Sequence, residues 1–157
     1  MNKSILSFVV LLFTLFTLQA QEFNTIPFHT DLSTLQDGWY KFELENTYFD
    51  VELAAGKLKK GIIKWADGSK YSGSLSGTSF SGKGTYTWPD GSRYEGAFRK
   101  HKRHGKGSYI NFDGTKWSGK WAANHKNGKG TVFDANGKAL KHGVWQSNEL
   151  IKESLLE

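Results

Sequence analysis

The side chains best suited to chemistry in this sequence lie within one stretch, residues 99–106, where five of eight residues are cationic and two are histidines. The histidines, His101 and His104, are three residues apart, a spacing at which two histidines can contribute ligands to a zinc site. Two cations stand between them and would repel a metal ion, and neither a cysteine nor a carboxylate completes a ligand set. We therefore expect no metal and no other cofactor.

The sequence lacks the usual signatures of catalysis. It contains no Gly-x-Ser-x-Gly nucleophile elbow. Its repeated Gly-Lys-Gly triplets lack the full spacing of a phosphate loop and the helix that follows one. Carboxylates of the central region fall mainly in predicted turns, at Asp67, Asp90 and Asp113, where turn geometry already accounts for them. We expect a protein that is not an enzyme.

Cations form the first candidate binding surface. Residues 61–145 carry 15 basic and 5 acidic side chains, whereas residues 22–60 and 146–157 are both net acidic. A basic segment of this kind favours anionic partners, although it also serves as an ordinary solubilising surface. The cations gather at connections between predicted hairpins, and successive connections stack along one edge of a sheet at ~10 Å intervals. The predicted binding ridge comprises Arg99, Lys100, His101, Lys102, Arg103, His104, Lys106, Lys126 and Lys129.

The elements that position these cations follow from an ungapped repeat of 23 residues. One column of the repeat holds Gly68, Gly91, Gly114 and Gly137, and the column three residues later holds Tyr71, Tyr94, Trp117 and Leu140. Three further columns hold glycine in three consecutive units. A fixed period of this length indicates a repeat architecture.

Each unit has the pattern of a β-hairpin. In residues 84–98, two alternating runs flank Asp90-Gly91, a pair suited to a tight turn because glycine takes positive φ and aspartate can bond its own backbone. Period-two alternation places aromatic residues and glycines on one face, where a ring can lie flat over bare backbone. We expect the sheet to curl over most of these rings and to leave a groove that is the second candidate binding surface. The predicted aromatic face comprises Trp65, Tyr71, Trp88, Tyr94, Trp117 and Trp121.

The combination of Tyr-x-Gly or Trp-x-Gly with a later Gly-Lys-Gly resembles the MORN repeat family. It occurs at Tyr71-Ser72-Gly73, Tyr94-Glu95-Gly96 and Trp117-Ser118-Gly119, each followed by a triplet at residues 82–84, 105–107 or 128–130. The resemblance covers about residues 61–145. It implies an all-β fold, in which hairpins form one elongated, twisted antiparallel sheet. Leu140 and His142 depart from the pattern at one end and Asp50 departs at the other, so we expect degenerate terminal repeats that act as caps.

The two ends of the chain have different predicted roles. Residues 1–20 have the basic start, the apolar core and the small residue before the cut that are typical of a signal peptide, with cleavage after Ala20. Residues 21–60 form an N-terminal capping segment with a degenerate hairpin, residues 61–145 the repeat array, and residues 146–157 a tail whose leucine spacing allows a short capping helix. The apolar run of residues 5–18 is shorter than a membrane-spanning helix, so we expect export to the periplasm or the exterior and no transmembrane segment in the mature chain.

We expect a non-catalytic binding or scaffolding module of the bacterial envelope or exterior that acts by protein–protein contact. The resemblance to MORN repeats implies protein–protein contact or association with anionic lipid. The alternative is binding of an anionic lipid or a surface glycan through the ridge or the aromatic face. Nucleic acid fits the charge, but export disfavours it as the natural partner.

Overall fold

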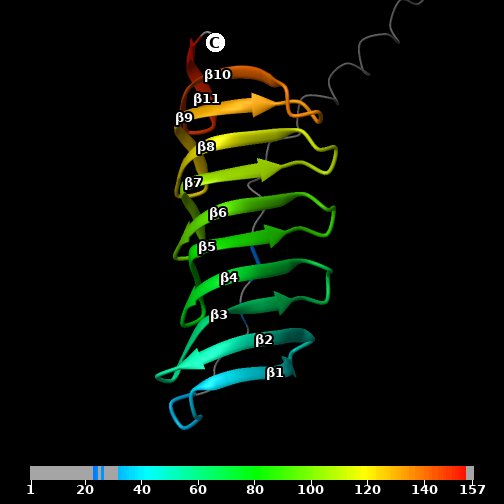
Figure 1. Cartoon of the computed structure of the whole chain (residues 1–157), viewed down its shortest axis with the longest axis vertical. Helices are drawn as coiled ribbons and strands as arrows, with labels where there is room; N and C mark the ends of the chain where they lie inside the picture. Colours follow the sequence, from blue (N-terminus) through cyan, green and yellow to red (C-terminus); the bar gives the residue numbers. More distant parts are fainter. Residues whose placement is uncertain (1–22, 25, 27–31, 155–157) are drawn as a thin grey trace, which may run out of the picture.

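The computed structural model describes residues 23, 24, 26 and 32–154, and this part of the chain forms one sheet of eleven antiparallel strands with no helix (Figure 1). Each strand pairs with the next one in sequence, so the order in the sheet is the order in the chain. The predicted all-β repeat fold is confirmed. The strands are β1 (Gly38–Leu44), β2 (Thr47–Ala54), β3 (Lys57–Lys64), β4 (Lys70–Ser76), β5 (Ser79–Thr87), β6 (Arg93–Arg99), β7 (Lys102–Ile110), β8 (Lys116–Ala122), β9 (His125–Phe133), β10 (Ala139–Gln146) and β11 (Glu149–Ser154).

Two kinds of turn join the strands of the array, and they lie on opposite sides of the stack (Figure 1). The longer loops carry the predicted Asp-Gly pairs. In the first of them Ser69 donates to the Asp67 carboxylate through its backbone N–H and its hydroxyl, at 2.8 and 2.7 Å, and Gly68 takes φ +89°. This is the local bonding expected of aspartate in a turn. The short turns have two residues each, such as Lys100-His101, both at positive φ.

The short turns also join each unit to the unit before it. The backbone N–H of His101 donates to the carbonyl oxygen of Phe80, and the N–H of Asn124 donates to that of Arg103. In return, the side-chain oxygen of Asn124 accepts a hydrogen bond from the backbone N–H of Arg103 at 2.7 Å. Stacking of successive turns, which the repeat predicts, is therefore held by backbone hydrogen bonds rather than by packing alone.

A row of glycines crosses eight strands of the sheet. Each glycine of the row stands directly opposite another on the neighbouring strand; the row is Gly61, Gly73, Gly84, Gly96, Gly107, Gly119, Gly130 and Gly143. A Cβ at Gly84 would lie 2.6–2.8 Å from atoms of the Tyr71 ring, and one at Gly107 would overlap the Tyr94 ring. The predicted packing of rings over bare backbone is thus confirmed.

The rings themselves form the core on that face. Tyr71 stacks on Phe80 with ring centroids 4.0 Å apart, and its hydroxyl donates to the carbonyl oxygen of Ser74 at 2.6 Å. Tyr94 repeats this bond to Ala97 at 2.9 Å. Burial raises the pKa of both tyrosines well above its ordinary value. Each ring therefore reaches across the glycine row with its polar end satisfied, as buried tyrosines require.

The two ends of the sheet have different outcomes. The predicted N-terminal hairpin joins the sheet as β1 and β2, which are connected by a two-residue turn at Glu45-Asn46. The predicted short C-terminal helix is wrong, because residues 149–154 form strand β11. Ser147 and Asn148 do not cap a helix; they form the same two-residue turn as the other units, and the Asn148 side chain accepts from the Lys126 N–H at 2.8 Å. The predicted signal peptide lies outside the described residues.

Candidate functional site

The predicted ridge does not form one surface. Its nine residues divide into a four-residue turn, two cations packed among aromatic rings, two lysines on the opposite face of the sheet, and one half-buried histidine on β7. We call Arg99, Lys100, His101 and Lys102 the cationic turn. Arg103 and Lys126 belong to the aromatic side, Lys106 and Lys129 lie exposed on the polar side, and His104 is half-buried on β7.

Three side chains of the cationic turn are exposed, and within the described residues none of them forms an ion pair. Arg99 and Lys102 stand directly opposite each other at the ends of β6 and β7, an arrangement in which like charges repel. The four other short turns of this side have the sequences Ala-Ala-Gly-Lys, Ser-Gly-Thr-Ser, Ala-Ala-Asn-His and Gln-Ser-Asn-Glu at the equivalent positions, with a single cation among them. The fold therefore makes the same turn without this charge.

The prediction that Arg103 belongs to an exposed ridge is wrong, because this residue is only 6% exposed. Its guanidinium lies 4.6 Å from the centre of the Trp121 ring and donates to the carbonyl oxygen of Asn124 at 3.1 Å. Burial lowers the pKa of Arg103 below its ordinary value. A planar guanidinium is more weakly hydrated than an ammonium and stacks well on an aromatic face, which favours its burial here. Arg103 therefore belongs to the packing of the array and is not available to a partner.

Lys126 takes the equivalent place one unit later. Its ammonium lies 5.4 Å from the ring centre of Trp117 and 5.1 Å from that of Trp145. Burial, and to a lesser extent the charge of Arg103, lowers the pKa of Lys126. One column of the repeat thus contains Phe80, Arg103 and Lys126. The first unit places a buried aromatic ring in this column, and the next two units place there a cation that packs on aromatic rings.

The two histidines of the predicted ridge do not share a site. His101 packs edge-on against Phe80 with ring centroids 4.7 Å apart, and its Nδ1 accepts a long hydrogen bond of 3.5 Å from the Phe80 N–H. Burial lowers the pKa of His101, which favours the neutral ring. Among the residues that the structure describes, no three histidines, carboxylates or cysteines are grouped so as to hold a metal ion.

The predicted aromatic face is largely covered. Five of its six residues are buried, and only Trp65 is half-exposed. Part of the cover comes from the N-terminal segment: Phe23 stacks on Trp88 with centroids 5.6 Å apart, and the backbone N–H of Asn24 donates to the Tyr86 hydroxyl at 3.1 Å. The rings of this face therefore serve the core, and the expected open groove is filled by the chain itself over β5 and β6.

A comparison with known protein families matches the MORN repeat to residues 71–93, 94–116 and 117–138. These three units are MORN repeats. Such repeats are generally binding or scaffolding modules and are typically not catalytic. A search of curated proteins finds no match to the chain. The structure shows that the hairpin geometry continues beyond the three matched units, into β3 before them and into β10 and β11 after them.

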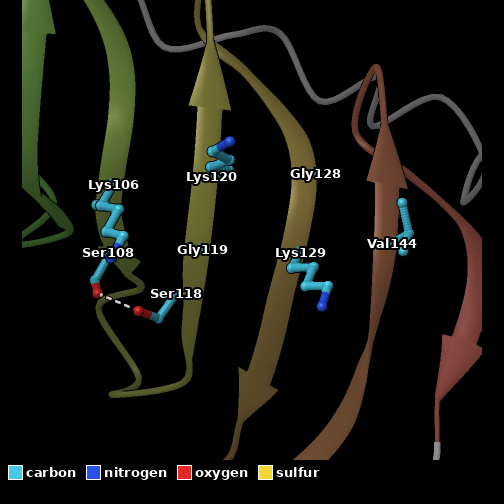
Figure 2. Close-up of a pocket in the computed structure, with 9 residues that line it drawn as sticks. Lys106, Ser108, Ser118, Gly119, Lys120, Gly128, Lys129 and Val144 are labelled. Carbon is cyan, nitrogen blue, oxygen red and sulfur yellow. Dashed lines mark hydrogen bonds between the residues drawn. The ribbon is translucent and has the colours of Figure 1, made fainter.

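The polar face of the sheet carries a surface that the sequence pattern was not used to predict. A trough of about 810 Å³ crosses β7 to β10; Figure 2 shows Lys106, Lys120 and Lys129 beside it, with Ser108 and Ser118 further along their strands. We call this hollow and its continuation toward β2 the polar trough. A signal for it exists in the sequence, because Lys60, Lys83, Lys106, Lys129 and Lys152 recur at the repeat period.

Proposed function

We propose that this chain is a non-catalytic scaffolding module of the bacterial envelope or exterior, and that its cationic turn binds an acidic surface of a partner protein. The observation that carries the proposal is the charge of that one turn. Four equivalent turns fold with a single cation among them, whereas the cationic turn places Arg99, Lys100 and Lys102 together and exposed. Because the fold gains nothing evident from these charges, they are available for recognition.

Several features favour a protein as the partner. The cationic turn is a compact group of four residues at the side of the sheet, so it can contact only a small area of a partner. A charged contact of this size steers encounter and sets specificity, as charges at the rim of protein interfaces do. The aromatic face, in contrast, is occupied by the chain's own Phe23 and Asn24 over β5 and β6. The predicted signal peptide at residues 1–20 supports the extracytoplasmic setting.

The proposal that the chain is not an enzyme is supported by its match to MORN repeats, which are typically not catalytic. Among residues 23, 24, 26 and 32–154, no group of side chains is arranged to hold a metal ion. Separately, none of these residues forms a helix long and apolar enough to span a membrane. The titratable groups with a shifted pKa are tyrosines of the core, turn aspartates, His101, Arg103 and Lys126. Each of these shifts is explained by packing or turn geometry.

A turn graft tests the proposal. Arg99→Ser, Lys100→Gly and Lys102→Ser together copy the neutral turn of residues 76–79, and Gly suits the φ of +50° at position 100. The matched control removes three exposed lysines elsewhere, with Lys57→Ser, Lys59→Ser and Lys138→Ser.

Mature wild-type protein and both variants would be used to retain proteins from envelope extract. We expect one protein to be retained at fixed stoichiometry by the wild type and the control and to be lost from the graft. Retention by all three forms contradicts the assignment to the cationic turn. Loss of binding to vesicles of anionic lipid by the graft, with no retained protein, supports the lipid alternative instead.

A further inference from the structure

The polar trough is one continuous feature that runs across the strands. The hollow at β7 to β10 shares Lys106 with a second hollow of about 470 Å³, and the second shares Ser72 and Gly73 with a third of about 410 Å³. Its floor is backbone, because the residues between its two walls belong to the glycine row, whose side-chain direction is toward the aromatic rings on the other face. A ligand in this trough would therefore lie perpendicular to the strands.

One wall of the trough is a track of lysines. Lys60, Lys83, Lys106, Lys129 and Lys152 stand on alternate strands, so consecutive members are ~10 Å apart. Lys120 adds a cation between two of them and stands directly opposite Lys106. Toward β2 the charge is neutralised, since Lys60 pairs with Glu52 at 3.2 Å. Lys106, Lys120 and Lys129 are exposed and form no ion pair among the described residues.

The opposite wall is rich in hydroxyl groups. It contains Ser72, Thr85, Ser108, Ser118 and Thr131, and Glu95 interrupts this series on β6. Toward β2 the row continues with Ile62 and the acidic Asp50. The Ser108 hydroxyl donates to that of Ser118 at 2.8 Å (Figure 2). Hydroxyls both donate and accept hydrogen bonds, so this wall can match a ligand that is itself rich in hydroxyls. At the far end of the trough, Trp39 lines it with 58% of its surface exposed.

We propose that the polar trough binds a linear acidic polysaccharide, with Lys106, Lys120 and Lys129 holding its carboxylate or sulfate groups. The spaced cations match a chain that carries charge at intervals, and the hydroxyl wall matches its sugar rings. The exposed ring of Trp39 offers a flat apolar surface for one sugar face. This inference is independent of the protein contact at the cationic turn, which lies at the side of the sheet.

Other anionic polymers fit less well. An extended peptide adds to a sheet through backbone hydrogen bonds at a free strand edge, whereas the backbone groups beneath the trough are already paired in the ladder. Single-stranded nucleic acid is bound with aromatic platforms under successive bases, and the lining of the trough at β7 to β10 contains no aromatic residue. A membrane presents its charges in a plane, but the floor here is recessed between two walls.

The test compares two matched triple variants of the mature protein. The trough variant carries Lys106→Gln, Lys120→Gln and Lys129→Gln, and the control carries Lys57→Gln, Lys59→Gln and Lys138→Gln, so both lose the same charge. The single change Lys120→Ala, which copies Ala97 of the preceding unit, provides a milder variant with little risk to folding. Thermal melts of all forms would verify that each is folded.

Binding would be measured by calorimetry with oligogalacturonate, a heparin-derived oligosaccharide, a neutral glucan, oligothymidylate and vesicles of phosphatidylglycerol. We expect at least one of the two acidic oligosaccharides to bind the wild type and the control with the same affinity. Its affinity for the trough variant should be lower by a factor of at least about ten, which is the loss expected for one charge-assisted hydrogen bond. Lys120→Ala should give an intermediate loss, and the glucan should not bind. The proposal would be overturned by any of three results. The trough variant could bind the acidic oligosaccharides as tightly as the wild type, or neither acidic oligosaccharide could bind the wild type. The third result is that binding of oligothymidylate or of vesicles depends equally on the same lysines.

Discussion

Gly96→Ala should destabilise the protein, although replacement of a strand glycine by alanine ordinarily stabilises by ~0.5–1 kcal/mol. Gly96 is paired with Gly107 in the glycine row and does not have positive φ, so an alanine there is not strained by its own backbone. A Cβ at this position would lie 2.5 Å from the Gly107 Cα, 2.8 Å from the Lys106 carbonyl oxygen and 2.6 Å from the Tyr94 hydroxyl. Two of these three atoms are backbone of the next strand.

The magnitude follows from what must move. Carbon atoms in good contact are ~3.5–4.0 Å apart, so β6 and β7 would have to separate by about 1 Å, or Tyr94 would have to leave its place. Overpacking of this kind costs ~1–3 kcal/mol. Loss of the Tyr94 hydrogen bond to Ala97 adds about 1 kcal/mol. We expect a loss of about 3 kcal/mol in the free energy of unfolding, and Gly96→Val should be no better tolerated.

Urea denaturation of the mature protein measures this change directly. An unchanged m-value would verify that the variant and the wild type expose the same amount of surface on unfolding. Gly91→Ala is the matched control, because Gly91 has φ +85° and nothing within 4 Å of an added Cβ. It should lose about 1 kcal/mol through backbone strain alone. If Gly96→Ala is neutral or stabilising, or loses no more than Gly91→Ala, the account of rings and strands packed on the glycine row is refuted.

The remaining predictions concern His101, two cations of the predicted binding ridge, and removal of the signal peptide. His101→Asn copies Asn124 of the next unit and should raise stability by about 1 kcal/mol, since the side-chain oxygen would accept the Phe80 N–H closely. Because burial lowers the pKa of His101 in the folded state, the unfolded chain takes up the proton first as the pH falls. The stability of the wild type should therefore decrease as the pH drops below about 6.5, and that of the His101→Asn variant should decrease less. Parallel pH profiles of stability for the two proteins would contradict this. Lys102→Glu should change stability by at most ~0.5 kcal/mol, whereas Arg103→Glu should cost ~3 kcal/mol or more, and similar melts of the two would show that Arg103 is not buried. Mass spectrometry of the exported protein should find a chain that starts near Gln21; a mature chain that retains residue 1 would reject the signal peptide.

Much of the fold could be predicted from the sequence because its determinants are local. The Asp-Gly pairs define the long loops through hydrogen bonds that span two residues, as at Asp67 and Ser69. The 23-residue period then fixes which residues share a face. What the period did not reveal is that every glycine of the row stands opposite another, since pairing depends on the bulges that shift the register, as between Gly96 and Phe98.

The candidate site was harder to predict, because a cation has the same sequence signature whether it is exposed or stacked on a ring. Arg103 was grouped with its charged neighbours, but its repeat column contains the buried Phe80, and the column proved the better guide. The C-terminal strand was missed for a related reason. The spacing of Leu150, Ile151, Leu155 and Leu156 resembles that of a helix. Ser147-Asn148 nevertheless repeats the short turn of the array and directs the chain back along β10.

Site-specific photo-crosslinking in cells that naturally produce the protein tests the central claim most directly. A photoreactive residue would replace Lys102 in the cationic turn or, as the matched position in a neutral turn, Ser79. Our account predicts one discrete covalent adduct with a single protein from position 102 and none from position 79. No protein adduct from position 102, or the same adduct from both positions, would contradict it.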